Sequence, residues 1–172
     1  MHFREVQYVH QNWIARLAML VILPGWLLGL YGFVQQIILG KTFGDNPSSD
    51  EGLIISTLLS SVVVLGLIWL VGFSKLETQI LDEGIGMYFS PFTSQRIYPW
   101  DEIQSADIRT YKPIQEYGDW GWRRGWGRKG QAYNVSGNKG LQLVFKDGRR
   151  ILIGTQRPDE LEQAIMTAKP RR

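Results

Sequence analysis

Side chains able to do chemistry are scarce in this chain of 172 residues, and they are poorly placed for catalysis. There is no cysteine, which excludes disulfides, thiolate metal sites and cysteine nucleophiles. The two histidines, His2 and His10, both lie at the N-terminus. Catalysis needs a nucleophile, base or metal in a shielded cleft. We therefore predict no catalytic residue, no metal site and no cofactor.

Acidic residues occur as adjacent pairs at predicted turns or at a predicted helix start, where solvated or capping roles are usual. These pairs are Asp82-Glu83, Asp101-Glu102 and Asp159-Glu160. The chain has no GxxxxGK[ST] motif and no GxGxxG motif that opens a helix, and 137–140 is typical of a turn entering a strand. These patterns predict a protein that is not an enzyme and has no small-molecule substrate.

The most unusual segment is 116–130, EYGDWGWRRGWGRKG, in which tryptophans and basic residues alternate with glycines. It lies within a predicted insertion at 112–139 that carries six basic residues against two acidic ones, a net +4 compared with +3 for the whole chain. A loop this long inside a small domain is usually functional or disordered. The predicted partner- or lipid-binding residues are Trp120, Trp122, Arg123, Arg124, Trp126, Arg128 and Lys129.

Four interpretations of this loop stay open. The tryptophans could fold back and enlarge a small core. They could dock on a membrane, because indole rings favour the headgroup level and nearby cations favour anionic lipid. They could form a hot spot for a protein partner, which tryptophan and arginine often dominate. Stacking on nucleic acid is the fourth, and attachment to a membrane together with the modest net charge argues against it.

Two apolar stretches precede the polar part of the chain. Residues 53–73 contain no charge, and at about 1.5 Å per residue they span roughly 30 Å, the thickness of the hydrocarbon core of a bilayer. Residues 13–39 form the other stretch, which Pro24 interrupts in a way that membrane helices tolerate. A signal peptide is the rival interpretation of 13–39, but the stretch is too long and no A-x-A-like cleavage site follows. We predict two transmembrane helices, with Gly25 and Gly29 as a close-packing or dimerisation face.

Basic residues at the ends of these stretches predict their orientation. Arg4 and Arg16 precede the first helix and Lys75 follows the second, whereas the connecting segment contains Lys41 alone. Because basic residues stay on the cytoplasmic side, residues 1–12 are predicted to be a cytoplasmic tail and 40–52 an extracytoplasmic loop. Both termini are then cytoplasmic.

Residues 74–172 are predicted to form a mainly-β domain. Short alternating runs separated by turn residues indicate about six or seven strands. Asp147-Gly148 predicts a tight primed hairpin turn between 141–145 and 150–153. A C-terminal helix begins near Pro158. This order is typical of a PH-like domain, a bent antiparallel barrel with a C-terminal helix. A β-sandwich in which the helix is not packed is the alternative.

The chain resembles small bacterial membrane proteins that carry two transmembrane helices and a bacterial PH-like domain. The resemblance rests on the helical start, on 99–103 (PWDEI) and 132–138 (AYNVSGN), and on the hairpin end at 151–156 followed by Pro158. It implies a multi-pass protein of the bacterial inner membrane and carries no established activity. The insertion at 112–139 departs from a compact PH-like domain.

Together these features predict a non-catalytic, membrane-tethered PH-like interaction module. We expect an accessory or scaffolding subunit of an inner-membrane assembly, with membrane lipid and a membrane-protein partner or a second copy of the chain as partners. No nucleic acid is expected. Binding or sensing of anionic lipid headgroups through the Trp/Arg loop is the alternative function.

Overall fold

The chain divides into a helical unit, residues 13–72, and a β unit built from residues 1–12 together with 73–172. The computed structural model describes residues 1–125 and 129–168. Each unit is considered by itself.

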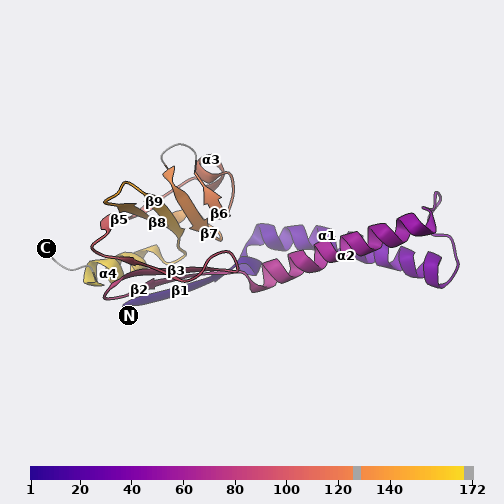
Figure 1. The fold of residues 1–172 in the computed structure, drawn as a ribbon, viewed down its shortest axis with the longest axis horizontal. Coiled ribbons are helices and arrows are strands. Elements are labelled where there is room, and N and C mark those ends of the chain that lie inside the picture. Colours follow the sequence, from indigo (N-terminus) through magenta and orange to yellow (C-terminus); the bar gives the residue numbers. More distant parts are fainter. Residues whose placement is uncertain (126–128, 169–172) are drawn as a thin grey trace. The chain divides into compact units, whose positions relative to one another are not determined.

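The helical unit contains two helices that are long and apolar enough to cross a membrane (Figure 1). The first, α1 (Trp13–Phe33), continues into a π-helical turn at Val34–Ile38, and the second is α2 (Asp50–Phe73). They have mean hydropathies of 2.1 and 2.5, and most of their apolar side chains are exposed, unlike those of a core helix in a soluble domain. The two apolar helices predicted from the sequence are thus confirmed. Helix α2 begins three residues earlier than predicted, because Asp50 and Glu51 occupy its first turn, where acidic side chains are favoured.

Contacts within the helical unit differ from the predicted ones. The Trp26 indole donates a hydrogen bond to the Ser61 hydroxyl at 3.1 Å. The ring of Phe43 covers Gly32 so closely that a Cβ there would lie 2.6 Å from it. At the predicted packing glycines, Gly25 and Gly29, a Cβ would meet nothing within 4 Å. The expected glycine contact between the two helices is therefore wrong, and those positions lie open.

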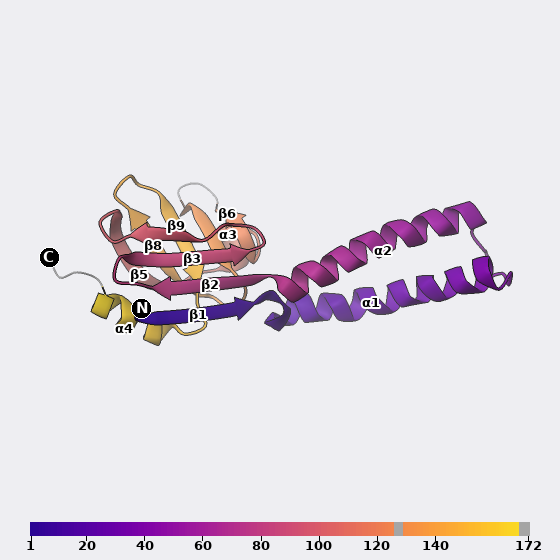
Figure 2. The same cartoon turned by 60° about the horizontal axis from the view of Figure 1, so that its bottom comes forward.

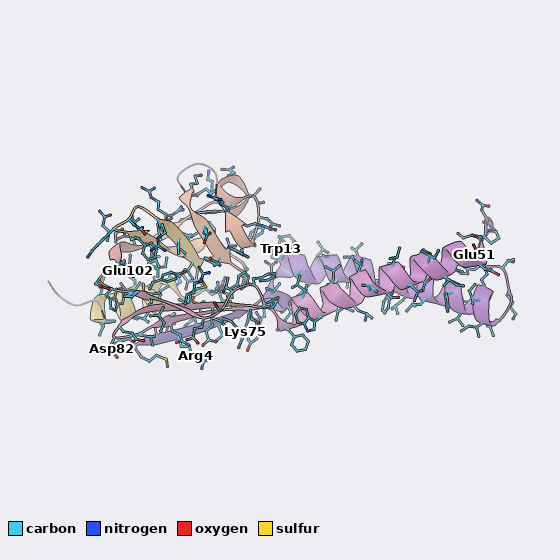
Figure 3. All side chains as sticks on the ribbon, viewed as in Figure 1. Arg4, Trp13, Glu51, Lys75, Asp82 and Glu102 are labelled. Atoms are coloured by element: carbon cyan, nitrogen blue, oxygen red, sulfur yellow. The ribbon has the colours of Figure 1, made fainter. Side chains whose placement is uncertain are left out.

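The charged side chains of this unit are confined to its ends. Figure 3 labels Trp13 at one end of the helical pair and Glu51 at the other, with the apolar side chains projecting between them. The segment joining α1 to α2 is tied to the helix ends by Gln36, whose amide donates to the Asp50 carboxylate at 2.8 Å and to the Ser48 carbonyl at 2.7 Å.

The β unit contains two sheets, which lie in separate layers in Figures 1 and 2. The four-stranded sheet has the order β1 (Phe3–Tyr8), β2 (Lys75–Ile80), β3 (Gly84–Ser90), β4 (Arg96–Pro99). The five-stranded sheet has the order β5 (Ile103–Thr110), β8 (Lys139–Phe145), β9 (Arg150–Gly154), β7 (Gln131–Asn134), β6 (Gly121–Arg124). A mainly-β unit is confirmed, but the described residues form nine strands instead of six or seven and no closed barrel.

The hydrophobic core lies between the inner faces of the two sheets. Alternation along each strand places every second side chain on that face. The C-terminal helix α4 (Pro158–Ala168) packs against strands of both sheets, β1 and β2 on one side and β5 and β8 on the other. Its Leu161 and Ile165 are buried in the same core. The predicted helix is thus confirmed as a packed element, and a β-sandwich without it is wrong.

The segment predicted to be an N-terminal tail is strand β1. It pairs antiparallel with β2, with Phe3 opposite Ile80 and Tyr8 opposite Lys75. A 3₁₀ turn at Val9–Gln11 follows. The prediction failed because FREVQY alternates only weakly in hydrophobicity and its partner strand lies some seventy residues away.

Polar side chains of this N-terminal segment tie it to the far end of the chain. The buried Glu5 carboxylate accepts hydrogen bonds from the Thr155 hydroxyl at 2.6 Å and from the Gln156 N–H at 2.7 Å. The Gln7 amide donates to the Gly154 carbonyl at 2.8 Å. The first residues of the chain are therefore an integral part of the β unit.

The predicted insertion at 112–139 is also ordered in large part. It contains the short helix α3 (Pro113–Tyr117) and strands β6 and β7, which complete the five-stranded sheet. Strand β7 pairs parallel to β9, so the expectation of a purely antiparallel sheet is wrong. Helix α3 covers a second, smaller core on the outer face of this sheet. Its members are Tyr111, Tyr117, Ala132 and Leu152.

The β8–β9 hairpin is confirmed, with a different turn from the predicted one. In this turn Gly148 has a positive φ of +86° and Asp147 does not, whereas a type I′ turn requires a positive φ at both residues. The N–H of Gly148 bonds the Phe145 carbonyl, and the N–H of Phe145 bonds the Arg149 carbonyl, both at 2.9 Å. This is the three-residue loop with glycine in the left-handed position.

Gly84→Ala is expected to destabilise the β unit by about 1 to 3 kcal/mol, while Gly86→Ala is expected to change little. A Cβ at 84 would lie 2.2 Å from the Tyr98 carbonyl oxygen, so β4 would have to move away from β3. At 86 the nearest atom, the Gln79 Cβ, lies at an ordinary 3.4 Å. Thermal unfolding of the full chain in detergent measures the difference. Equal losses of Tm in the two variants would contradict this packing.

Glu5→Ala is expected to lower stability by about 1 to 3 kcal/mol, because the Thr155 hydroxyl and the Gln156 N–H lose a buried charged acceptor. Glu83→Ala removes an exposed carboxylate and serves as the control, with an expected change within about 0.5 kcal/mol. Hydrogen exchange at 154–157 should rise in the first variant only. Unchanged exchange there would show that β1 does not hold this segment.

Candidate functional site

The predicted contact residues on β6 point to opposite faces of the five-stranded sheet. Trp122 lies opposite Tyr133 in the register, and Arg124 lies opposite Gln131, whereas Arg123 lies between them on the other face. The loop therefore does not present its cations and aromatics as one surface. Trp126 and Arg128 lie outside the described residues.

The two described tryptophans of the loop are partly structural. The Trp122 ring stacks on the buried Tyr133 ring, with 6.4 Å between centroids and an interplanar angle of 9°, and its other face leaves the residue 48% exposed. The Trp120 indole donates a hydrogen bond to the Gly137 carbonyl at 3.1 Å. Of these two, Trp122 offers an exposed aromatic surface that a partner could contact.

Two of the predicted cations are paired with acidic neighbours. Arg123 lies 3.7 Å from the Asp119 carboxylate, and Lys129 lies 3.8 Å from that of Glu116. Glu116 also accepts a bidentate pair from Arg109, at 3.0 and 3.3 Å, and the Lys112 N–H at 2.9 Å. Partial burial would raise the pKa of Glu116, but these donors outweigh it and lower the pKa. Glu116 thus anchors both ends of this segment.

Arg124 lines an open cleft of about 800 Å³ between the edges of the two sheets. One wall is formed by three residues that lie side by side on neighbouring strands: Arg124 on β6, Gln131 on β7 and Ile151 on β9. The facing wall is Arg96 and Tyr98 of strand β4, which lies at the edge of the other sheet. The remaining described lining residues are Gly125 and Gly130, together with Gly148, Arg149 and Arg150 at the β8–β9 turn.

Among the described residues, the cleft lining contains four arginines and no acidic side chain. Arg149 is paired with Asp147 and with Glu102 at 3.7 Å, and its guanidinium lies 4.8 Å from the centre of the Phe145 ring. For residues 1–125 and 129–168, the structure gives Arg96, Arg124 and Arg150 no carboxylate partner within ion-pair distance. Of these, Arg150 alternates with Ile151 and so lies on the outer face of the sheet, which leaves Arg96 and Arg124 on the cleft. The cleft therefore has an excess of positive charge.

Tyr98 lines this cleft with its side chain, but its hydroxyl is enclosed in the protein. It is 6% exposed, and its ring meets the Phe145 ring edge-on at 5.3 Å. Its hydroxyl has no hydrogen-bond partner within the described part of the chain, although the Arg96 guanidinium approaches it. Burial raises the pKa of Tyr98, nearby Tyr133 adds to this, and the cations Arg96 and Arg149 oppose it. The hydroxyl is thus a neutral donor at ordinary pH.

Chemically, this arrangement is suited to an anion. Guanidinium groups present paired N–H donors that match carboxylate and phosphate oxygens. The Tyr133 hydroxyl donates to the Gln131 amide oxygen at 2.9 Å, which fixes that amide in the wall. Among the described residues, no cluster of three potential metal ligands occurs.

Sequence reasoning found one of the cleft residues, Arg124, and missed the others. The missed residues are Arg96, Tyr98, Gln131, Arg149 and Arg150. A local signal existed for two of them, because Arg96 and Tyr98 stand two apart in a predicted strand and so share a face. No local pattern shows that this strand lies across from β6.

No protein-family model, curated protein or solved structure matches this chain. The resemblance to bacterial PH-like membrane proteins therefore stays a prediction.

Glu116→Gln is expected to destabilise the β unit by about 1 to 2 kcal/mol near neutral pH. Because the pKa of Glu116 is lowered in the folded chain, its contribution is present above its ordinary value of 4.5 and is lost as the pH falls through the folded value. The difference in Tm between wild type and variant should shrink on acidification below about pH 4.5. Asp107→Asn, at an exposed position, is the control. A difference that does not depend on pH would contradict the anchoring role.

Proposed function

We propose that this chain is a non-catalytic interaction module that two transmembrane helices tether to a membrane, and that its binding site is the arginine cleft. The observation that carries the proposal is that Arg96 and Arg124, which have no carboxylate partner within the described residues, line one cleft from facing walls. An accessory or scaffolding subunit of a membrane-protein assembly fits this arrangement, because its task is to hold a partner near the membrane. The PH-like ancestry suggested by sequence resemblance is part of the proposal.

The proposed setting is the bacterial inner membrane, with two crossings and both termini in the cytoplasm. Two apolar helices of sufficient length support the crossings. The distribution of basic residues supports the orientation, because Arg4, Arg16 and Lys75 flank the crossings on one side and Lys41 stands alone on the other. The cleft would then face the cytoplasm.

The chemistry of the cleft supports binding in place of catalysis. Its lining consists of arginines, Tyr98, Gln131, Ile151 and glycines. An arginine stays protonated at any pH that a protein meets and so makes a poor general base. Such a lining is suited to binding a negatively charged group.

Recognition of anionic lipid headgroups is the second candidate. The exposed ring of Trp122 favours it, because indole prefers the headgroup level of a membrane. Each cation close to an anionic leaflet adds about 1 kcal/mol. In this candidate the cleft binds lipid instead of a partner protein.

A photo-crosslinking amino acid in place of Gln131, in full-length protein in cells, tests the proposal. We expect adducts to a defined membrane protein, and we expect Arg96→Ala with Arg124→Ala to remove them while the chain stays in carbonate-washed membranes. The adjacent Arg123→Ala is the matched control, because this arginine lies on the other face beside Asp119. Adducts to lipid alone would favour the second candidate. Adducts that persist in the double variant, or a chain that washes off the membrane, would refute the proposal.

A further inference from the structure

We infer that one end of the β unit docks on the headgroup layer of the membrane through the exposed rings of Phe92 and Trp122. This end is the one from which the chain enters the helices. The inference rests on the proposed function in one respect, that the two helices cross that membrane. It goes further than the second candidate function, because the lipid meets an aromatic surface whose two rings do not line the arginine cleft.

The five-stranded sheet places Trp122 at this end. Strand β7 ends at Asn134, and the Asn12 amide donates a hydrogen bond to the next carbonyl, that of Val135, at 2.5 Å. Asn12 directly precedes α1. Trp122 pairs with Tyr133, which stands only two residues before Val135. Trp122 therefore lies at the end of the sheet from which the chain enters the first helix.

The four-stranded sheet places Phe92 at the same end. Lys75 begins β2 two residues after the end of α2, and it pairs with Ser90, the last residue of β3. Phe92 stands two residues further on, in a turn that is closed by a hydrogen bond from the Thr93 N–H to the Phe89 carbonyl at 2.8 Å. Phe92 therefore lies where the chain leaves the second helix.

Buried rings connect the two exposed rings into one aromatic cluster. The ring centroid of Phe92 lies 5.1 Å from that of Phe89, and Phe89 meets Tyr133 edge-on at 6.5 Å. Tyr133 carries the stacked ring of Trp122. The two inner rings are each 1% exposed, whereas Phe92 is 42% and Trp122 is 48% exposed. The cluster thus spans both sheets, is anchored in the core and ends in two rings that face solvent.

A lipid surface is the partner that fits these two rings. Exposed apolar surface next to a polar rim is typical of membrane and protein contact sites, and aromatic side chains favour the interfacial layer of a bilayer. In the proposed setting the helices hold this end at the bilayer, so the local concentration of headgroups is high without any further association step. A protein partner would have to arrive from elsewhere.

Lysines at the same end complement an anionic leaflet. Residues 135–138 connect β7 to Lys139, which begins β8 opposite Thr110 at the end of β5. Lys112 follows two residues after Thr110, and both lysines are exposed. Within residues 1–125 and 129–168, neither has a carboxylate at ion-pair distance. Basic side chains near an anionic surface are attracted to it, so these lysines add charge complementarity to the aromatic contact.

Fluorescent reporters in the full chain test the inference, because the native sequence contains no cysteine that would be labelled as well. Ser94→Cys, beside Phe92, carries a fluorophore in nanodiscs of phosphatidylcholine and phosphatidylglycerol that contain a lipid with a nitroxide on its headgroup. Met166→Cys is the matched reporter, since Met166 is exposed next to Thr167, which lies near Met1 at the opposite end of β1. We expect the Ser94 label to be quenched about twofold more than the Met166 label, or further.

Removal of the two rings separates docking from simple tethering. Phe92→Ala with Trp122→Ala should lower quenching of the Ser94 label by about twofold, toward the Met166 value, because the tether alone then holds this end near lipid. Ile97→Ala is the control, since it removes a side chain that is 43% exposed on the outer face of β4 and should leave quenching unchanged. Undiminished quenching in the double variant, or an equal loss in Ile97→Ala, would overturn the inference.

Two milder variants keep the test independent of folding. Trp122→Phe retains an apolar ring against Tyr133 and should preserve quenching. Phe92→Ala alone leaves the Trp122 stack in place, and it should lower quenching by a smaller amount while Tm stays close to that of the wild type. If quenching in these variants and in the double variant followed Tm instead of the number of exposed rings, the inference would be wrong.

The occupant is identified in the same discs. Because the purified chain is the only protein present and each disc holds one copy, quenching there supports lipid as the partner. Quenching that needs two copies in a disc would assign a second copy and overturn the inference. Lys112→Ala with Lys139→Ala should weaken the dependence of quenching on phosphatidylglycerol and on salt. An unchanged dependence would overturn the role of the lysines.

Failure of the inference and failure of the proposed function give different results. If the Ser94 label is quenched no more than the Met166 label, while the crosslinks from Gln131 to a protein still depend on Arg96 and Arg124, the inference fails and the proposed function stands. If the chain washes off membranes in carbonate, the two fail together.

Discussion

The pairing of β1 with β2 is the constraint on which the rest of the structure depends. It builds the β unit from two stretches of chain that the helical pair separates, because β1 precedes α1 and β2 follows α2. Phe3 belongs to the main core, and the buried Glu5 holds Thr155 and Gln156. A fragment that begins after the second helix therefore lacks an edge strand, part of the core and an internal anchor. The β unit completes its fold only when chain from both sides of the helices is present.

The distribution of acidic side chains explains why positive charge gathers in one place. Glu116 pairs with Arg109 and Lys129, and Asp119 pairs with Arg123. The positive charge of these three side chains is therefore largely offset. Within the described ranges, the cleft side has no acidic side chains beyond Asp147 and Glu102, which meet Arg149. A chain with a formal charge of only +3 can thus present a strongly cationic site. Net charge alone would not have revealed it.

The features predicted correctly from sequence are those that a single stretch of chain determines. Uncharged runs longer than eighteen residues gave both apolar helices, and Asp147-Gly148 gave the β8–β9 hairpin. The features that were predicted wrongly depend on pairings between segments that are distant in the sequence. Strand β1 finds its partner across the helices, and the parallel β7–β9 pair turns a supposed insertion into sheet. The cleft forms only when several such strand pairings are in place. Arg124 was therefore the one lining residue that a local sequence pattern identified.

In the proposed setting, attachment to a membrane lowers the intrinsic affinity that the cleft needs. A soluble module has to overcome the full loss of translational freedom when it binds, whereas a module anchored in the same membrane as its partner or lipid meets it at an effective concentration that can reach the millimolar range. Few contacts then suffice for occupancy. Exposed ion pairs that salt screens would be too weak for a soluble receptor. In the proposed setting, a few arginines are enough, and the weakness of their contacts keeps the interaction reversible.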